Sequence, residues 1–351
     1  MPYGGGVQTT IREVRRQPLG MIVYFRAIAI LLIVAGHTYT QAGIRLDTTF
    51  DYTLSNLIKG ATALFVFISG FLFNHVYMAH YRYTNFLRER AQKILIPYCI
   101  LTILAILADL IFSSSAAGRI SAGMLFRDFA LGATFQAYWY IPFIILMYAL
   151  APLHRLFTSL RTPLQVAIMI ALAVLAGFVQ RPISNDNAFQ SVVFYLPIYL
   201  SGIFLSLNFG QFLPILRRHG YLLLLVAILL ATIQAINGQG GNLHKQFFAF
   251  QGFEMMGIQK VTFSLGLIGI FSLLSNSPGR IVTVVANTSF AIFFLHPFVL
   301  WLLEGHAFFK VTQLPWLNLA VAVVAIVAVC VVTALILRFI LQANSKYLTG
   351  Y

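Results

Sequence analysis

Charge is scarce in this sequence, and so is cysteine. Charged side chains make up only 9% of the 351 residues, whereas a soluble globular protein carries about 25%. A surface exposed to water on all sides is therefore excluded. The only two cysteines, Cys99 and Cys330, each lie inside an apolar run without a CxxC partner. No His, Asp or Glu group shows metal-ligand spacing either, so a disulfide framework, a thiol nucleophile and a bound metal are not expected.

Long apolar runs dominate what remains. The chain is 60% hydrophobic with a mean hydropathy of +0.85. Runs of about 20 residues, the length of one membrane crossing, alternate with short polar breaks, whereas barrel strands are shorter and alternate in polarity. The sequence predicts an all-α polytopic membrane helical bundle with about ten transmembrane helices. They are expected at residues 20–41, 54–77, 93–113, 135–153, 163–180, 191–208, 220–236, 255–275, 283–304 and 316–341.

The basic residues indicate how the bundle is oriented. The formal net charge is +14, but lysine and arginine lie at the ends of the apolar runs and form no stripe for nucleic acid. With ten spans, most of them fall on the side of the N-terminus, which predicts that both termini are cytoplasmic. We expect a disordered cytoplasmic arm (1–19), one transmembrane domain (20–341) and a cytoplasmic tail (342–351). The expected partner is the lipid bilayer, not nucleic acid.

Two ionisable residues interrupt the first span. Arg26 and His37 are eleven residues apart, so on a helix they share one face and lie roughly 16 Å apart along the axis. A charged side chain near the bilayer centre costs roughly 2.5–3.5 kcal/mol, which favours a functional role. His37 is the candidate general base, because a neutral imidazole accepts a proton from a hydroxyl near neutral pH. The alternatives are a hydrogen bond to a neighbouring helix for His37 and an ion pair with a carboxylate for Arg26.

Further ionisable residues are predicted at the depth of His37, which indicates a polar pocket open to the outside. Asp109 or Glu304 is a candidate to orient the imidazole, and His296 or Lys59 a candidate to stabilise an oxyanion. The carboxylates would otherwise be solvated at helix ends. Lys260 lies at the same predicted depth.

A basic cluster precedes the third span, on the predicted cytoplasmic side. It contains Arg88, Arg90 and Lys93, and Arg90 and Lys93 share a helix face. Anchoring of the span by the positive-inside rule accounts for the cluster. A functional interpretation is that these cations bind the phosphates of a cytoplasmic donor. Composition alone does not separate the two interpretations.

Five stretches follow a common pattern along residues 20–340. They are Arg26-x10-His37; Leu64–Phe73, which contains Ser69; Arg90-x-x-Lys93 with Ile96-Pro97-Tyr98; Trp139-Tyr140 with Pro152; and Ala286–Phe298, which contains His296. In this order they resemble the acyltransferase-3 family of integral membrane O-acyltransferases. The sequence departs from the family where Lys93 replaces a frequent arginine, since lysine lacks the planar fork of two-point phosphate binding.

The resemblance implies a ten-helix enzyme of the bacterial inner membrane, of the stand-alone type without a fused outer esterase-like domain. Such an enzyme moves an acyl group, usually acetyl, from cytoplasmic acyl-CoA to a hydroxyl of an extracytoplasmic saccharide such as exopolysaccharide, O-antigen, capsule or a lipid-linked sugar. Acetyl-CoA is then a co-substrate, and no permanently bound cofactor is expected. Arg26 and His37 would be catalytic, while Arg88, Arg90 and Lys93 would bind the donor.

Ser69, Trp139 and Tyr140 would line or support the substrate pocket, together with His296, Lys59, Asp109 and Glu304. The residues leave two routes open, direct transfer to the acceptor and transfer through an acyl-His37 intermediate. They also leave two other classes of function open. One is a transporter or flippase for a lipid-linked saccharide, and the other is a structural partner in a polysaccharide-synthesis complex.

Overall fold

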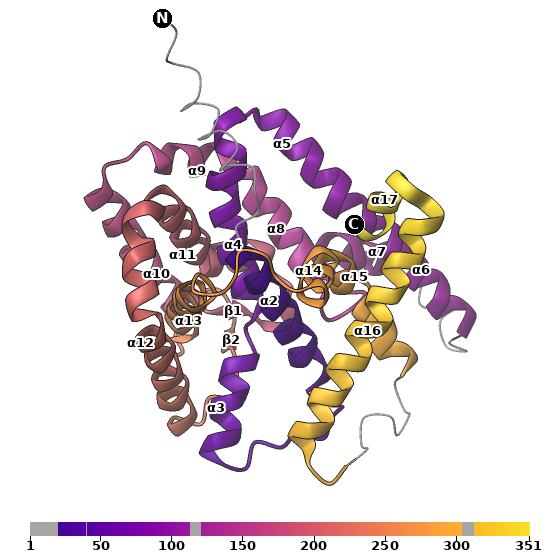
Figure 1. Ribbon diagram of the computed structural model, residues 1–351. Coiled ribbons are helices and arrows are strands. Elements are labelled where there is room, and N and C mark those ends of the chain that lie inside the picture. The colour runs from indigo at the N-terminus through magenta and orange to yellow at the C-terminus, as the bar shows by residue number, and fades with distance from the viewer. Residues whose placement is uncertain (1–19, 40, 113–120, 304–311) are drawn as a thin grey trace, which may run out of the picture.

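The computed structural model describes residues 20–39, 41–112, 121–303 and 312–351, and nearly all of its regular structure is helical (Figure 1). The predicted arm 1–19 and Glu304 lie outside the described residues. The helices are α2 (Gly20–Thr38), α3 (Thr49–Ile58), α4 (Thr62–Leu72), α5 (Tyr83–Arg90), α6 (Ile96–Phe112), α7 (Ala122–Phe126), α8 (Tyr140–Ala149), α9 (Ala151–Thr158), α10 (Thr162–Val179), α11 (Ala188–Leu207), α12 (Phe209–Ile236), α13 (Met256–Phe271), α14 (Arg280–Asn287), α15 (Ser289–Leu302), α16 (Pro315–Leu341) and α17 (Lys346–Thr349).

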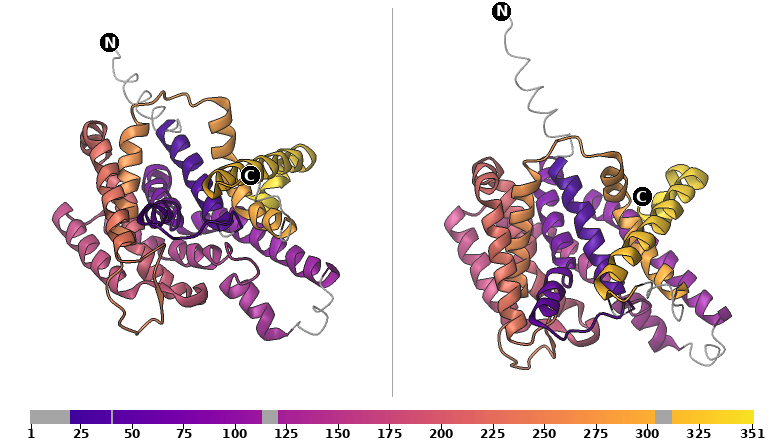
Figure 2. Two further views of the ribbon diagram at one scale, coloured as in Figure 1. Left: turned by 90° about the horizontal axis from the view of Figure 1, so that it is seen from below. Right: turned by 60° about the horizontal axis from the view of Figure 1, so that its bottom comes forward.

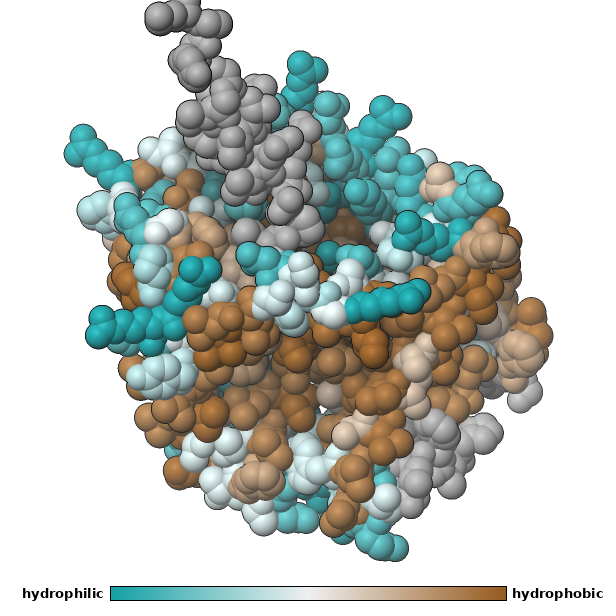
Figure 3. Space-filling view, viewed as in Figure 1, coloured by the Kyte–Doolittle hydropathy of each residue, from teal (hydrophilic) through white to brown (hydrophobic). Residues whose placement is uncertain are grey.

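The described residues contain seven helical stretches that are long and apolar enough to cross a membrane. Two bent pairs, α8 with α9 and α14 with α15, raise the number to nine. The shorter apolar helix α13 occupies the position of the remaining predicted span. A belt of apolar side chains crosses the visible face between polar ends (Figure 3). The prediction of an all-helical, multi-pass membrane bundle is confirmed.

Helix boundaries differ from the predicted spans where local polar chemistry sets them. The predicted span 54–77 begins earlier, at α3, because Thr48 and Asp51 form a capping box. The same span breaks at Gly60, which adopts a φ of +74°. The predicted span 220–236 forms the C-terminal part of the longer helix α12. The first turns of α12 carry polar residues, so the sequence pattern did not predict them as part of the span.

Helix α2 lies in the middle of the bundle (Figure 1) and packs against α4, α13, α14, α15 and α16. Around it, α12 runs along α13, and α4 runs along α11 (Figure 2). The α4–α11 pair is packed backbone against backbone at Gly70 and Gly202. A Cβ on Gly70 would overlap the carbonyl oxygen of Tyr199, and one on Gly202 would overlap that of Phe67.

Two short features outside the long helices matter for the cavities. At the His37 end of α2, strands β1 (Arg181–Pro182) and β2 (His244–Lys245) form a parallel pair that joins two loops. At the opposite end, the segment after α16 forms a 3₁₀ turn and α17, which pack against the chain between α5 and α6. Residues 342–351, predicted as a tail, are therefore folded onto the bundle. Gly350 lies against the Lys93 carbonyl, where a side chain would not fit.

Candidate active site

The two ionisable residues of α2 line two different cavities. Arg26 lines a cavity of about 540 Å³, and His37 lines one of about 430 Å³ toward the other end of the helix. We call them the Arg26 pocket and the His37 pocket. Their lining residues do not overlap within the described part of the chain. Arg26 donates a hydrogen bond from Nη2 to Ser289 Oγ at 2.9 Å, at the 74° bend between α14 and α15.

Cations from three parts of the chain surround the Arg26 pocket. Besides Arg26 they are Arg90 and Lys93 beside α5, and Arg338 and Lys346 from the C-terminal region. No Asp or Glu is among its described lining residues. Among the described ion pairs only Arg90 has a carboxylate partner, so the other cations are available for an anionic ligand. The closeness of Arg338 and Lys346 to Arg90 and Lys93 depends on the tertiary fold and is not visible in the sequence.

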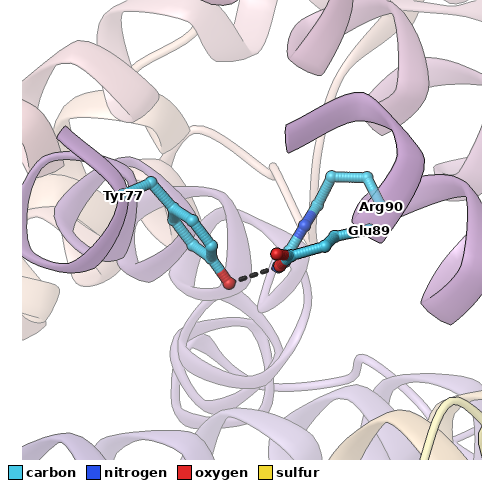
Figure 4. A network of polar contacts seen from close by, with 3 residues as sticks. All are labelled: Tyr77, Glu89 and Arg90. Atoms are coloured by element: carbon cyan, nitrogen blue, oxygen red, sulfur yellow. Dashed lines mark hydrogen bonds and ion pairs between the residues drawn. The ribbon is translucent and has the colours of Figure 1, made fainter. Parts of the chain in front are cut away.

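Arg90 is fixed in place by aromatic rings and one carboxylate. The Arg90 guanidinium donates a hydrogen bond to the Tyr77 hydroxyl, and the Glu89 carboxylate forms an ion pair with the same guanidinium at 3.7 Å (Figure 4). It also lies 4.6 Å from the centre of the Tyr77 ring. Tyr77 and Lys93 both lie in π-helical turns, Phe73–Tyr77 and Ala91–Leu95, and such turns are frequent at functional sites.

Ser69, predicted to line or support the substrate pocket, lines the Arg26 pocket. Arg88, predicted to bind the donor, is exposed and does not line this pocket, because a helix turns about 200° over the two steps from Arg88 to Arg90. The predicted cluster of three cations is thus reduced to two at the pocket.

The His37 pocket is polar, and loops supply most of its polar groups. Lys59 and Trp139 line it as predicted, and Gln136, Arg181 and His244 are additions. Other polar members are Thr62, Ser184, Asn185 and Asn242. A signal for Arg181 exists in the sequence, since it is a basic residue on the side where the positive-inside rule makes such residues rare.

His37 also borders a second cavity of about 240 Å³, which it shares with His296 and Gln136. The two imidazole rings are 5.3 Å apart between centroids. His296 donates a hydrogen bond from Nδ1 to the Ile292 carbonyl at 2.9 Å, so its Nε2 carries the lone pair. That Nε2 is buried without a hydrogen-bond partner among the described residues. The structure therefore brings the two predicted histidines together.

Among the described residues, Gln136 is the one that lines both of the cavities that contain His37. Asp109 instead lines a separate cavity of about 310 Å³ with Asp128, and Glu304 lies outside the described residues. Within the part of the chain that the structure describes, no carboxylate borders either cavity that contains His37.

Lys260 and Tyr140 are buried away from both pockets. Lys260 is 0% exposed and donates hydrogen bonds to the carbonyls of Asn56 and Leu57 at 2.8 and 2.9 Å, which indicates a structural role. Tyr140 packs its ring against Phe143 and Phe293. The aromatic pair of the motif is thus divided, with the preceding tryptophan at the cavity and Tyr140 in the core.

A model of the acyltransferase domain of the acyltransferase 3 family matches residues 22–335. The chain belongs to the acyltransferase 3 family. The match extends from the first turn of α2 to the later part of α16, so it includes most of both pockets. No curated protein and no solved structure matches the chain.

Family membership makes the chain a multi-pass membrane acyltransferase. It thereby confirms the resemblance based on the five sequence stretches and favours an enzyme over a transporter. An acyltransferase needs a donor and an acceptor, and two polar cavities at opposite ends of one helix meet that need. The family model leaves the donor and the acceptor to be inferred from the chemistry of the cavities.

Proposed function

We propose that this family member is an O-acyltransferase. It moves an acyl group, acetyl by expectation, from a coenzyme A thioester in the Arg26 pocket to a saccharide hydroxyl in the His37 pocket. The observation that carries the proposal is that α2 supplies a cation to one cavity and an imidazole to the other. In a bacterial inner membrane, the Arg26 pocket would face the cytoplasm, in accord with the positive-inside rule.

The charge of the Arg26 pocket supports a phosphate-bearing donor. Charge-assisted hydrogen bonds from arginine and lysine to phosphate are about twice as strong as neutral ones. Helix α15 begins at Ser289, the hydrogen-bond partner of Arg26, and the first N–H groups of a helix favour an anion. Coenzyme A carries phosphates that suit these cations, and its extended arm can reach into the bundle. The expected binding residues are Arg26, Arg90, Lys93, Arg338 and Lys346.

The chemistry requires one base and one leaving group. A saccharide hydroxyl oxygen attacks the thioester carbonyl carbon while the His37 imidazole takes the hydroxyl proton. The C–S bond then breaks, the ester remains on the sugar, and the thiolate takes the proton from the His37 imidazolium to become the free thiol of coenzyme A, which restores the base. Lys59 borders the same pocket, so its ammonium is near enough to stabilise the oxyanion, whereas the free Nε2 of His296 carries a lone pair and has no proton to donate.

The reaction also requires the two cavities to be connected. Arg26 and His37 are separated by about 16 Å along the axis, which an extended pantetheine arm spans. Ala29 and Ile30 lie between them on α2 and are fully buried. We expect the side chains around Ala29 and Ile30 to move apart when the pantetheine arm of the donor enters.

The direct test uses membranes that contain the full chain, incubated with acetyl-CoA labelled in the acetyl group and with an acceptor glycan. The expected product is a labelled glycan whose label is released by mild base, as an ester requires. Membranes without the protein are the control. A complete lack of base-labile label on the glycan would rule out the proposed reaction for that acceptor class, and lack of coenzyme A binding would rule out the donor.

Replacing Arg90 by alanine is expected to weaken coenzyme A binding by about tenfold or more, because a charged hydrogen-bond donor is lost from a partly buried site. The matched control is Arg88→Ala, two residues earlier, whose side chain is exposed and outside the pocket. Affinity is measured by equilibrium binding to the purified protein in detergent. Equal losses in the two variants would contradict the assignment of Arg90 to the pocket.

Removal of both Arg338 and Lys346, by substitution with alanine, is expected to raise the KM for acetyl-CoA by about fivefold with little change in kcat. The effect is smaller than for Arg90 because Arg338 is exposed to solvent. The variant should also discriminate less between coenzyme A and its 3′-dephospho form. Arg218→Ala on α12, exposed and remote from the pocket lining, is the control. An unchanged KM would show that the C-terminal cations do not contact the donor.

A further inference from the structure

Among the described residues, two cations at the His37 pocket, Arg181 and Lys59, have no carboxylate in an ion pair with them. Arg181 is only 7% exposed, and its Nη2 donates a hydrogen bond to the Asn185 side chain at 2.5 Å. Its Nε is buried and lacks a hydrogen-bond partner among the described residues. Lys59 donates to the Gly240 carbonyl at 3.2 Å. Among the described ion pairs, neither residue appears with a carboxylate.

Aromatic rings account for only part of the stabilisation of these charges. The Arg181 guanidinium lies 4.4 Å from the centre of the Trp139 ring, and the Lys59 ammonium lies 4.5 Å from that of Tyr39. A cation–π contact uses the face of the guanidinium and leaves its N–H donors free. The described hydrogen bonds of the Arg181 side chain use one of its five N–H donors, so it retains donors for an anion.

The neighbouring titratable groups do not supply the missing negative charge. Glu254 is 1% exposed and accepts a hydrogen bond from the Leu243 N–H at 3.0 Å. Burial raises the pKa of Glu254 to about 8, so this carboxyl is mainly protonated at pH 7. Burial and the charge of Arg181 lower the pKa of His244, which therefore stays neutral. Asp186, the acidic residue nearest to Arg181 in the sequence, is exposed and does not line the pocket.

We propose that the His37 pocket takes an acceptor saccharide that carries a negatively charged group, a carboxylate or a phosphate, bound by Arg181 with the help of Lys59. The inference rests on the proposed function and names the substrate class of its acceptor site. Arginine presents a planar pair of donors that matches both anions. The anionic group would fix the sugar so that a hydroxyl elsewhere on it faces His37, across the same cavity. Arg181 is thus a specificity-determining residue and takes no part in proton transfer.

The test compares pairs of probes in which one member carries the anionic group and the other lacks it. Trigalacturonate and its carboxyl-reduced, neutral trisaccharide form one pair, and glucose 1-phosphate with glucose forms the other. Binding of each probe to the full chain is measured in detergent, in the presence of coenzyme A. We expect at least one anionic probe to bind about tenfold or more tightly than its neutral partner. The pair that shows the difference identifies the anion as carboxylate or phosphate.

Substitutions of the pocket cations test whether the difference in affinity between anionic and neutral probes arises in this pocket. Arg181→Gln is expected to remove most of the preference for the anionic probe and to leave the weak binding of the neutral probe unchanged. Lys59→Gln should remove part of it, and Arg181→Lys should retain part. The control Arg45→Gln, an exposed basic residue on the same side that does not line the pocket, should change nothing. Unchanged coenzyme A binding in each variant verifies that the bundle is folded.

Three results would overturn the inference. They are equal binding of charged and neutral probes, no binding of either anionic probe, and a preference for the anion that persists in both Arg181→Gln and Lys59→Gln. Failure of the proposed function has a different signature, namely that the wild-type protein does not bind coenzyme A or forms no labelled ester on any glycan. Labelled ester formed equally well on neutral and anionic glycans would refute the acceptor class alone.

Discussion

Replacement of His37 by alanine is expected to lower acyl transfer by about 10²–10⁴-fold while donor binding remains intact. The imidazole borders two cavities, and within the described residues no carboxylate lines either of them to act as a base in its place. The proposed coenzyme A site is the separate Arg26 pocket, so coenzyme A affinity should stay within about twofold of wild type. The measurements are initial rates with labelled acetyl-CoA and equilibrium binding of coenzyme A.

The control for this variant is His219→Ala, since His219 lies on α12 and lines neither cavity that contains His37. Wild-type transfer rates in His37→Ala would exclude His37 as the base. The His37→Ala variant also distinguishes direct transfer from transfer through an acyl-His37 intermediate. If acetyl-CoA labels the wild-type protein in the absence of acceptor but does not label His37→Ala, the result would indicate an acyl-His37 intermediate.

Substitution of Gly202 by valine is expected to prevent correct assembly of the bundle. A Cβ at this position would overlap the carbonyl oxygen of Phe67 on α4, and backbone atoms cannot move aside as a side chain can. Overpacking of a core typically costs about 1–3 kcal/mol of stability. We expect a cost at or above the upper end of this range when two helix backbones are forced apart. The expected result is loss of the monodisperse protein in detergent chromatography, or a thermal midpoint lowered by several degrees.

Gly210→Val is the matched control. Gly210 also lies in a helix, α12, and a Cβ there meets no atom within 4 Å. Both substitutions add the same side chain, and valine is intrinsically a better helix former than glycine, so a loss of stability confined to Gly202→Val isolates the packing effect. A Gly202→Val protein as stable as Gly210→Val would mean that α4 and α11 are not in close backbone contact.

The arrangement of spans could be predicted because membrane helices reveal themselves by apolar length. The first span was predicted at residues 20–41 and is observed at Gly20–Thr38, where the Thr38 hydroxyl donates to the Val34 carbonyl near the helix end. The 74° bend at Thr288 was not predicted, although the polar residues Asn287, Thr288 and Ser289 mark the position, because the size of the bend depends on tertiary packing. The π-helical turns escaped prediction for the same reason.

The site shows the same division between local and distant information. Arg26 and His37 were found because a charge in an apolar run is costly, and this cost is visible in one helix. Arg338 and Lys346 were missed as pocket residues because about 250 positions separate them from Arg90. Gln136 was missed as a residue that lines both cavities of His37, since an uncharged amide in a loop carries no local signal of function.

The folded C-terminal segment has a practical consequence for handling the protein. Tyr351 and Gly350 line the Arg26 pocket, and the Tyr351 ring lies 4.6 Å from the Arg338 guanidinium. An affinity tag or fluorescent reporter joined after Tyr351 would start at the rim of this cavity and compete with a ligand for space. A protease site before a C-terminal tag would allow its removal ahead of any assay.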